Sequence, residues 1–133
     1  MSEVRGIVVA HARLAEALVD TVERISGLGG GLLAVSNEGL GPERLREALR
    51  DAIAGEPAIL FVDLASGSCG IAGLGLSHEG GDVAVVTGAN VPMLLDFVFH
   101  RTLPLEELAI RVRDKARAGI RAHGCASRPP EGS

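Results

Sequence analysis

His11 is the residue of this chain whose type and position most clearly indicate chemistry. It follows a short apolar segment, 4–10, that is typical of a buried strand, and it precedes an amphipathic helix predicted to start at about Ala12 and to end near Ser26. A strand-to-helix junction lies at the carboxyl edge of a parallel sheet, where open α/β folds bind ligands. The N–H groups of a helix N-terminus favour a phosphate, and a neutral imidazole is a nucleophile near pH 7. We therefore predict a histidine that handles phosphoryl groups, with the helix N–H groups from Ala12 onward as phosphate donors.

Asp63 is the second candidate, because it follows another apolar segment, 58–62, that is also typical of a buried strand. In the strand order argued below, the 4–10 and 58–62 strands are neighbours whose connections leave in opposite directions. His11 and Asp63 are therefore expected to meet at this switch point of the sheet. A carboxylate beside an imidazole fixes its tautomer and supports a positive charge on the ring, so Asp63 is expected to orient His11.

Two further groups are predicted to lie on the same edge. Ser66, Gly67 and Ser68 follow Asp63 in a loop, and their N–H and hydroxyl groups are suited to hold phosphoryl oxygens. Gly88 and Asn90 follow the fourth strand and are expected to form one wall of the cleft. Each group alone has a structural alternative, such as a helix cap or a simple turn, and the functional interpretation depends on all of them sharing one edge.

The remaining histidines and both cysteines are interpreted as having no chemical role. His78, His100 and His123 lack a position at that edge and are taken as surface or helix-end residues. Cys69 and Cys125 are too few and too far apart for a zinc motif, and Cys69 has no basic neighbour in sequence that would activate it. Two free thiols fit a reducing compartment, and nothing in the sequence requires a metal or a cofactor.

The elements that must position these residues alternate regularly along the chain. The further predicted elements are a strand at 32–36, a helix after Gly41-Pro42, a weak, glycine-broken helix from about Ser68 to His78, a strand at 82–87, a short helix at 91–100 and a last helix from about Pro104. This order predicts right-handed crossovers and an α/β, doubly wound parallel sheet with strand order 2-1-3-4. The first helix is expected to bury one stripe of apolar side chains: Leu14, Ala17, Leu18, Val22 and Ile25.

Composition narrows the class of protein. The chain has 133 residues, of which 47% are apolar, with no Trp or Tyr and three Phe, so an aliphatic core is expected within one domain, 1–125, followed by a disordered tail, 126–133. A net charge of −4 without a basic run argues against nucleic acid as a partner. No apolar stretch approaches the roughly 20 residues that span a bilayer, and the N-terminus has no signal-peptide layout, so a cytoplasmic protein is expected.

Four segments of the chain resemble a known family over residues 4 to about 123. They are Gly6–His11, Leu14–Leu18, Phe61–Asp63 together with Gly67-Ser68, and Val86–Leu94. The last segment is close to the signature TGxNxPML and is the most specific. On these motifs the chain resembles the enzyme IIA component of the mannose class of the bacterial phosphoenolpyruvate-dependent sugar phosphotransferase system.

The resemblance implies a function and a more detailed fold. In that family the histidine matching His11 accepts phosphate from the small carrier protein HPr and passes it to an enzyme IIB component, which phosphorylates sugar during uptake. The aspartate matching Asp63 supports this histidine, and the serine matching Ser68 lies in the loop that contacts the phosphate. The family fold adds a short antiparallel fifth strand that is exchanged across a homodimer, and here it would fall near Gly119–His123. The membrane is involved only indirectly, through the permease.

Departures from the family pattern keep other functions open. The family usually has Thr or Ser before the histidine and Gly after it, where this chain has Ala10 and Ala12. The loop 64–69 lacks the family's aromatic residue, one glycine and the proline. An alternative is therefore a regulatory interaction protein of a partial phosphotransferase system, whose phosphorylation state at His11 controls a target protein. The related phosphate donor of dihydroxyacetone kinases and an inert flavodoxin-like domain rank lower.

Overall fold

The computed structural model describes residues 3–124, which form a parallel sheet between two layers of helices. In chain order the elements are β1 (Arg5–Ala10), α1 (Leu14–Ser26), β2 (Leu32–Ser36), α2 (Pro42–Ile53), β3 (Ala58–Val62), α3 (Ser68–Ser77), β4 (Val83–Thr87), α4 (Val91–Val98) and α5 (Leu105–Ala118). This order confirms the predicted alternation of strands and helices. The tail predicted at 126–133 lies outside the described residues.

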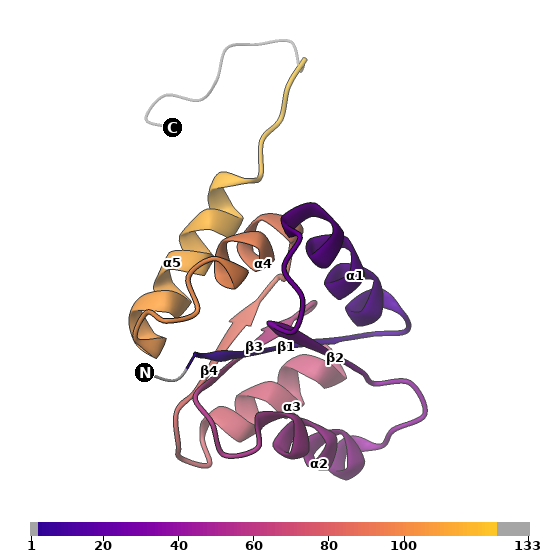
Figure 1. Ribbon diagram of the computed structural model, residues 1–133. Helices are drawn as coiled ribbons and strands as arrows, with labels where there is room; N and C mark the ends of the chain where they lie inside the picture. Colours follow the sequence, from indigo (N-terminus) through magenta and orange to yellow (C-terminus); the bar gives the residue numbers. More distant parts are fainter. Residues whose placement is uncertain (1–2, 125–133) are drawn as a thin grey trace.

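The sheet has the predicted strand order β2-β1-β3-β4, and all of its pairs are parallel. Helices α1, α4 and α5 cover one face of the sheet, and α2 and α3 cover the other (Figure 1). β1 and β3 therefore lie at the centre of the molecule. Parallel strands that are covered on both faces must be apolar throughout, and this accounts for the continuous apolar runs of these two strands.

The core is divided by the sheet into two aliphatic clusters. Successive residues of β1 point to opposite faces, so Val8 belongs to the cluster under α1, α4 and α5 while Ile7 and Val9 belong to the cluster under α2 and α3. Aromatic packing is limited to an edge-to-face contact between Phe61 and Phe97, whose ring centroids are 5.0 Å apart. The expectation of an aliphatic core is confirmed for the described residues.

The predicted inner stripe of α1 is partly wrong. Ala15 and Val22 are the buried residues of this helix, whereas Leu14 is 43% and Ile25 is 61% exposed and Ala17 is also exposed. The prediction followed the largest apolar side chains. The structure instead turns the small Ala15 toward the sheet, which lets the helix backbone approach closely, and leaves the larger residues at the flanks.

The two central strands, β1 and β3, end side by side at the carboxyl edge of the sheet. β1 and β3 pair in register, with Val9 opposite Val62, so the residues that follow each strand emerge beside each other. The connection after β4 returns to the same edge, because the Ala89 N–H donates to the Val62 carbonyl at 2.9 Å. This edge therefore collects His11, Asp63 and the start of α4.

The segment after α5 forms no strand within residues 3–124. Gly119 to Gly124 are exposed, and the chain there runs away from the sheet as an extended segment (Figure 1). The fifth strand implied near Gly119–His123 is thus absent from the single chain. Across these described residues, no helix combines the length and apolar character that crossing a membrane requires.

Candidate active site

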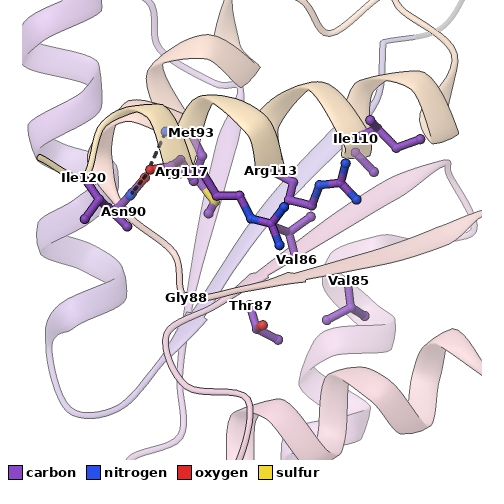
Figure 2. A pocket seen from close by; sticks show the side chains of 12 residues that line it. Val85, Val86, Thr87, Gly88, Asn90, Met93, Ile110, Arg113, Arg117 and Ile120 are labelled. Carbon is purple, nitrogen blue, oxygen red and sulfur yellow. Dashed lines mark hydrogen bonds between the residues drawn. The ribbon is translucent and has the colours of Figure 1, made fainter. Parts of the chain in front are cut away.

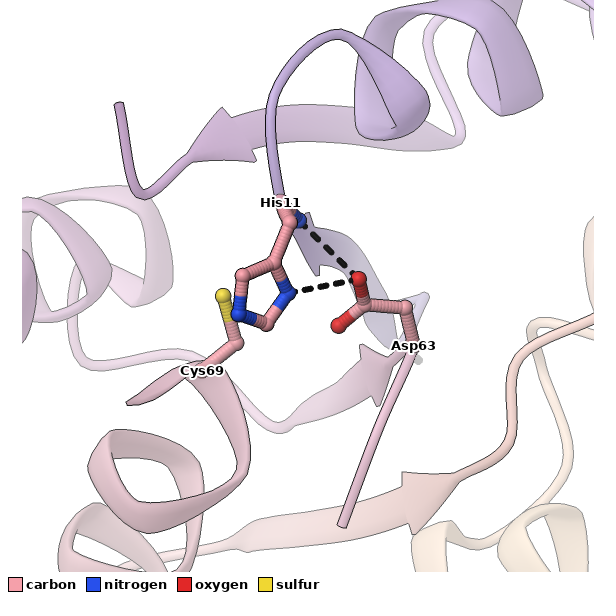
Figure 3. Close-up of side chains that lie close together, drawn as sticks. All are labelled: His11, Asp63 and Cys69. Carbon is pink, nitrogen blue, oxygen red and sulfur yellow. Dashed lines mark hydrogen bonds and ion pairs between the residues drawn. The ribbon is translucent and has the colours of Figure 1, made fainter. Parts of the chain in front are cut away.

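His11 and Asp63 are in direct contact, as predicted. The Nδ1 atom of His11 lies 2.8 Å from Oδ2 of Asp63, and the His11 backbone N–H donates to the same oxygen at 3.0 Å (Figure 3). The imidazole side chain is 38% exposed, whereas the carboxylate is 9% exposed. The pair thus consists of a ring that a partner can reach and a carboxylate that is fixed behind it.

The surroundings of Asp63 keep its carboxyl ionised. Burial alone raises the pKa of this carboxyl, but hydrogen bonds from the His11 backbone, the His11 ring and the Leu64 N–H outweigh burial and hold the pKa below its ordinary value. An ionised carboxylate only accepts hydrogen bonds, so Nδ1 of His11 carries the proton that lies between them. The Nε2 atom is then the ring nitrogen with a lone pair, and it faces away from Asp63.

Gly67 packs against the other side of the ring. A Cβ atom at this position would lie 2.7 Å from Cε1 and 3.1 Å from Nε2 of His11. The backbone of Gly67 is extended, with φ −84°, so the glycine is required by the space that the ring takes rather than by its conformation. Gly67 is the N-cap of α3, and the first turn of α3, which begins at Ser68, therefore lies beside His11.

The predicted start of α1 at Ala12 is wrong, and this changes the expected phosphate donors. Ala12 has a left-handed backbone, with φ +53°, and α1 begins at Leu14. The Ala12 N–H donates to Oδ1 of Asn37 at 3.3 Å, and the Leu14 N–H donates to the His11 carbonyl at 3.1 Å. These two amides are engaged within the protein, so α3 is better placed than α1 to present N–H groups beside the ring.

Two residues at the end of β2 also belong to this site, and the sequence patterns did not single them out. The Asn37 Nδ2 group donates to the Ser68 hydroxyl at 3.1 Å, and the Ser36 hydroxyl donates to the Ala12 carbonyl at 2.6 Å. They connect the turn after His11 with the first turn of α3. The predicted strand order could have pointed to both residues. In that order β2 is the neighbour of β1, so the carboxyl end of β2 must lie beside His11.

Cys69 is a further residue that sequence reasoning set aside. It is fully buried in the first turn of α3, and donor atoms of Cys69, His11 and Asp63 all lie within 4.8 Å of one another (Figure 3). Burial and the negative charge of Asp63 raise the pKa of the Cys69 thiol. No basic neighbour in the sequence could have revealed this position, since only the path of loop 64–67 into the first turn of α3 brings the sulfur to the ring.

Gly88 and Asn90 lie at the expected edge but line a different pocket. That pocket has a volume of about 480 Å³ between β4 and α5, and neither His11 nor Asp63 is among its lining residues (Figure 2). Asn90 caps α4 by accepting from the Met93 N–H at 3.1 Å, and its Nδ2 group donates to the Ala116 carbonyl at 3.1 Å. In this single chain its hydrogen bonds are those of a helix cap.

Comparison with solved structures shows the same fold in proteins of the sugar phosphotransferase system. The phosphotransferase system component EIIA from Streptococcus agalactiae is 24% identical over 90% of this chain and 96% of its own, with a TM-score of 0.83. The mannose/sorbose-specific IIA subunit from Enterococcus faecalis is 19% identical over 99% of this chain and 100% of its own, with a TM-score of 0.78. A sigma-54 interaction domain protein from Enterococcus faecalis is 17% identical over 88% of this chain and 93% of its own, with a TM-score of 0.73.

A match to a protein family identifies this chain more closely than its fold does. No curated protein matches the chain significantly. Residues 6–112 match the EIIA-man family, described as the PTS system fructose IIA component. This match includes β1 from Gly6 onward, the whole of β3 and the neighbourhood of His11. The chain therefore belongs to the fructose- and mannose-type IIA family of the bacterial sugar phosphotransferase system.

Proposed function

We propose that this chain is a phosphocarrier whose His11 accepts a phosphoryl group from phospho-HPr and passes it to an enzyme IIB component. The observation that carries the proposal is the contact of 2.8 Å between His11 Nδ1 and Asp63 Oδ2, in a chain of the IIA family. The proposal treats residues 1–125 as one domain acting in the cytoplasm. Both partners are proteins, and the membrane is reached only through the permease that the IIB component serves.

The arrangement around His11 supports a transfer at Nε2. The lone pair of Nε2 attacks the phosphorus of the phosphohistidine on HPr, a new P–N bond forms, and the P–N bond to HPr breaks as the HPr imidazole leaves. The His11 ring, protonated on Nδ1 and phosphorylated on Nε2, then carries a positive charge. The carboxylate of Asp63 compensates that charge at short range and keeps the ring in one orientation. Transfer to the IIB component is a second displacement of the same kind, in which a nucleophile of the IIB component attacks the phosphorus, the P–N bond to His11 breaks and the His11 imidazole leaves.

The loop after β3 supports binding of the phosphoryl oxygens. Phosphoryl transfer depends mainly on alignment and on stabilisation of charge, which fixed N–H donors and a helix N-terminus provide. The first turn of α3 lies beside Nε2, and Asn37 holds the Ser68 hydroxyl in place. We assign phosphate binding to Gly67, Ser68 and the exposed Ser66, with a smaller part for Ala12, whose N–H must first release the Asn37 side chain.

The free edge of β4 supports assembly into a homodimer. β4 ends the sheet within the described residues, and the chain after Ala118 is exposed and extended, with Ile120 75% exposed. An unpaired strand edge favours the addition of another strand. We propose that Gly119–His123 of one copy pairs with the edge of β4 in the other. Light scattering should give twice the chain mass for the intact chain and the chain mass for a variant that ends at residue 118, and a monomeric intact chain would contradict the exchange.

Phosphorylation in a purified system tests the phosphocarrier. The chain is incubated with phosphoenolpyruvate, enzyme I and the HPr of the same organism, and its intact mass is followed over time. We expect the wild type to gain one acid-labile phosphoryl group and His11→Ala to gain none while keeping its circular dichroism spectrum. His78→Ala is the matched control, because His78 is an exposed histidine at the end of α3. Normal phosphorylation of His11→Ala would refute the assignment.

A regulatory role for the same phosphorylation is the second candidate. It is favoured by the likeness in fold to a sigma-54 interaction domain protein and by the departures of loop 64–69 from the family pattern. Adding the IIB component encoded with this chain separates the two roles. Loss of the phosphoryl group from the chain with gain by the IIB component supports transport. Retention of the phosphoryl group, together with a partner that binds one phosphorylation state only, supports regulation.

A further inference from the structure

The side chains of His11, Asp63 and Cys69 form a cluster that the phosphocarrier function does not fully use. One donor atom from each of them lies within 4.8 Å of the other two. The cluster unites an imidazole nitrogen, a carboxylate oxygen and a thiol sulfur, which come from the ends of β1 and β3 and from the first turn of α3. Nitrogen and sulfur donors together favour Zn²⁺ over the hard cations Mg²⁺ and Ca²⁺.

His11 has the orientation of a zinc-binding histidine. Its Nδ1 atom is held by Asp63 at 2.8 Å, which leaves Nε2 on the side of the ring away from Asp63. A metal-bound histidine commonly has such a carboxylate behind its second nitrogen, because the carboxylate fixes the ring and increases its basicity. Since Asp63 also accepts the His11 and Leu64 N–H groups, its place behind the ring is firmly set.

Cys69 supplies the second donor. Its sulfur lies on the side of the ring that carries Nε2 (Figure 3). A tetrahedral zinc ion with bonds of about 2.1 Å to nitrogen and about 2.3 Å to sulfur holds these two ligands about 3.6 Å apart. One donor atom of each residue lies within 4.8 Å of the others, so binding requires the Cys69 side chain to turn toward the ring while Asp63 keeps the ring in place. The bound ion displaces the thiol proton, so that one Zn²⁺ enters and one proton leaves.

We propose that His11 Nε2 and Cys69 Sγ bind Zn²⁺, that Asp63 positions the imidazole from behind, and that water completes the coordination of the ion. The consequence for function rests on the proposed phosphocarrier role. Zinc and the phosphoryl group would occupy the same nitrogen atom, so each excludes the other. Zinc would therefore hold the chain in its unphosphorylated state.

Titration with Co²⁺, a spectroscopic substitute for zinc, tests the site directly. No phosphoryl donor is present. We expect the wild type to develop a thiolate-to-cobalt charge-transfer absorption that saturates at one ion per chain and disappears when Zn²⁺ is added. Cys69→Ser should lack this absorption. Cys125→Ser, which changes the other cysteine of the sequence, should keep it. Asp63→Asn should weaken binding about 10- to 100-fold, as expected when a ligand loses its supporting carboxylate.

The outcomes that overturn the site are equally specific. They are no absorption in the wild type, the same absorption in Cys69→Ser, or its loss in Cys125→Ser. Circular dichroism checks that Cys69→Ser is folded, and Cys69→Ala replaces it if the buried hydroxyl prevents folding. His11→Ala changes a partly exposed residue and serves as an independent variant, because unchanged cobalt affinity in that protein also refutes the site.

A second experiment tests whether the metal and the phosphoryl group compete for His11. Zinc should slow the phosphorylation of wild type, and it should slow Cys69→Ser less, each compared with its own rate without zinc. Equal inhibition of both proteins would show that zinc acts on the donor proteins, which contradicts competition at His11. If the chain accepts no phosphoryl group at all, the phosphocarrier proposal fails while the cobalt titration still decides the metal site.

Discussion

Replacing Gly67 by alanine places a methyl group against the ring of His11. The added Cβ would lie 2.7 Å from Cε1, and an ordinary contact requires at least 3.4 Å. The ring has to recede, which strains its contact of 2.8 Å with Asp63. The same methyl group would lie 3.1 Å from Nε2, in the space that the phosphoryl oxygens need. We therefore expect Gly67→Ala to impair phosphorylation without unfolding the protein.

The size of the effect follows from the displacement. Moving a reacting group by about 1 Å costs about 100-fold in rate. The ring must move by most of this distance, so phosphorylation of Gly67→Ala by phospho-HPr should be slower by roughly 100-fold, which corresponds to about 2.7 kcal/mol in the barrier. The free energy of unfolding should change by less than about 1 kcal/mol, the effect of alanine in place of glycine at a helix N-cap.

Gly41→Ala is the matched control for this experiment. Gly41 is the N-cap of α2 and is extended like Gly67, with φ −76° against −84°, but a Cβ at Gly41 would meet no atom within 4 Å. Both variants change a helix cap in the same way, and only one of them crowds His11. The assay is the time course of phosphoryl gain by intact mass, with urea unfolding measured on the same samples.

Equal phosphorylation rates in the Gly67 and Gly41 variants would refute the reasoning. That result would mean that the first turn of α3 does not approach Nε2 during transfer. A slow Gly67 variant that also unfolds at much lower urea than the Gly41 variant would contradict the expectation that its effect is confined to the site.

Three further predictions concern the carboxylate and a helix end. Asp63→Asn removes a charge-assisted hydrogen bond worth about 1.5–3 kcal/mol, so phosphorylation should slow roughly 10- to 150-fold, and an unchanged time course would contradict the role of Asp63. Because the folded-state pKa of Asp63 is lowered, its contribution to stability is present above its unfolded pKa of about 3.9 and is lost as the pH falls through the folded value. Thermal unfolding from pH 7 downward should therefore show a steeper loss below about pH 4 in wild type than in Asp63→Asn, and parallel curves would argue against the lowered pKa. Ala54 ends α2 with φ +53°, so Ala54→Gly should stabilise the protein against urea by roughly 1 kcal/mol, whereas Ala52→Gly within the helix should destabilise it by a similar amount.

The sequence was most informative about the sheet. Apolar runs such as 58–62 are long enough to mark buried strands, and the regular alternation with helices leaves few possible topologies. Given the order β2-β1-β3-β4, the meeting of His11 with Asp63 is a consequence of register rather than of any local motif. The central pair of the site was therefore predictable from residue patterns.

The details of the loops were not predictable in the same way. Hydrophobic periodicity cannot reveal that Ala12 adopts φ +53° and delays the start of α1 to Leu14. The approach of Cys69 to the ring depends on the path of loop 64–67 and on the first turn of α3, where Gly70 is required because a Cβ there would collide with the Ala65 backbone. The conformation at such positions depends on packing between segments that are distant in sequence. A periodic pattern of apolar residues therefore cannot predict it.

The site joins two segments of very different composition. His11 and Asp63 each extend a central strand whose apolar side chains are fully buried, whereas α3 carries Gly70, Gly73 and Gly75 within ten residues. Amide hydrogens of β1 and β3 should exchange with solvent only on global unfolding, while those of α3 should exchange through local opening at much lower free energy. In the proposed carrier, the nucleophile would be held on the buried strands while the side that binds the phosphoryl group adjusts. This division would suit the proposed role, in which one nitrogen must fit a donor and then a different acceptor.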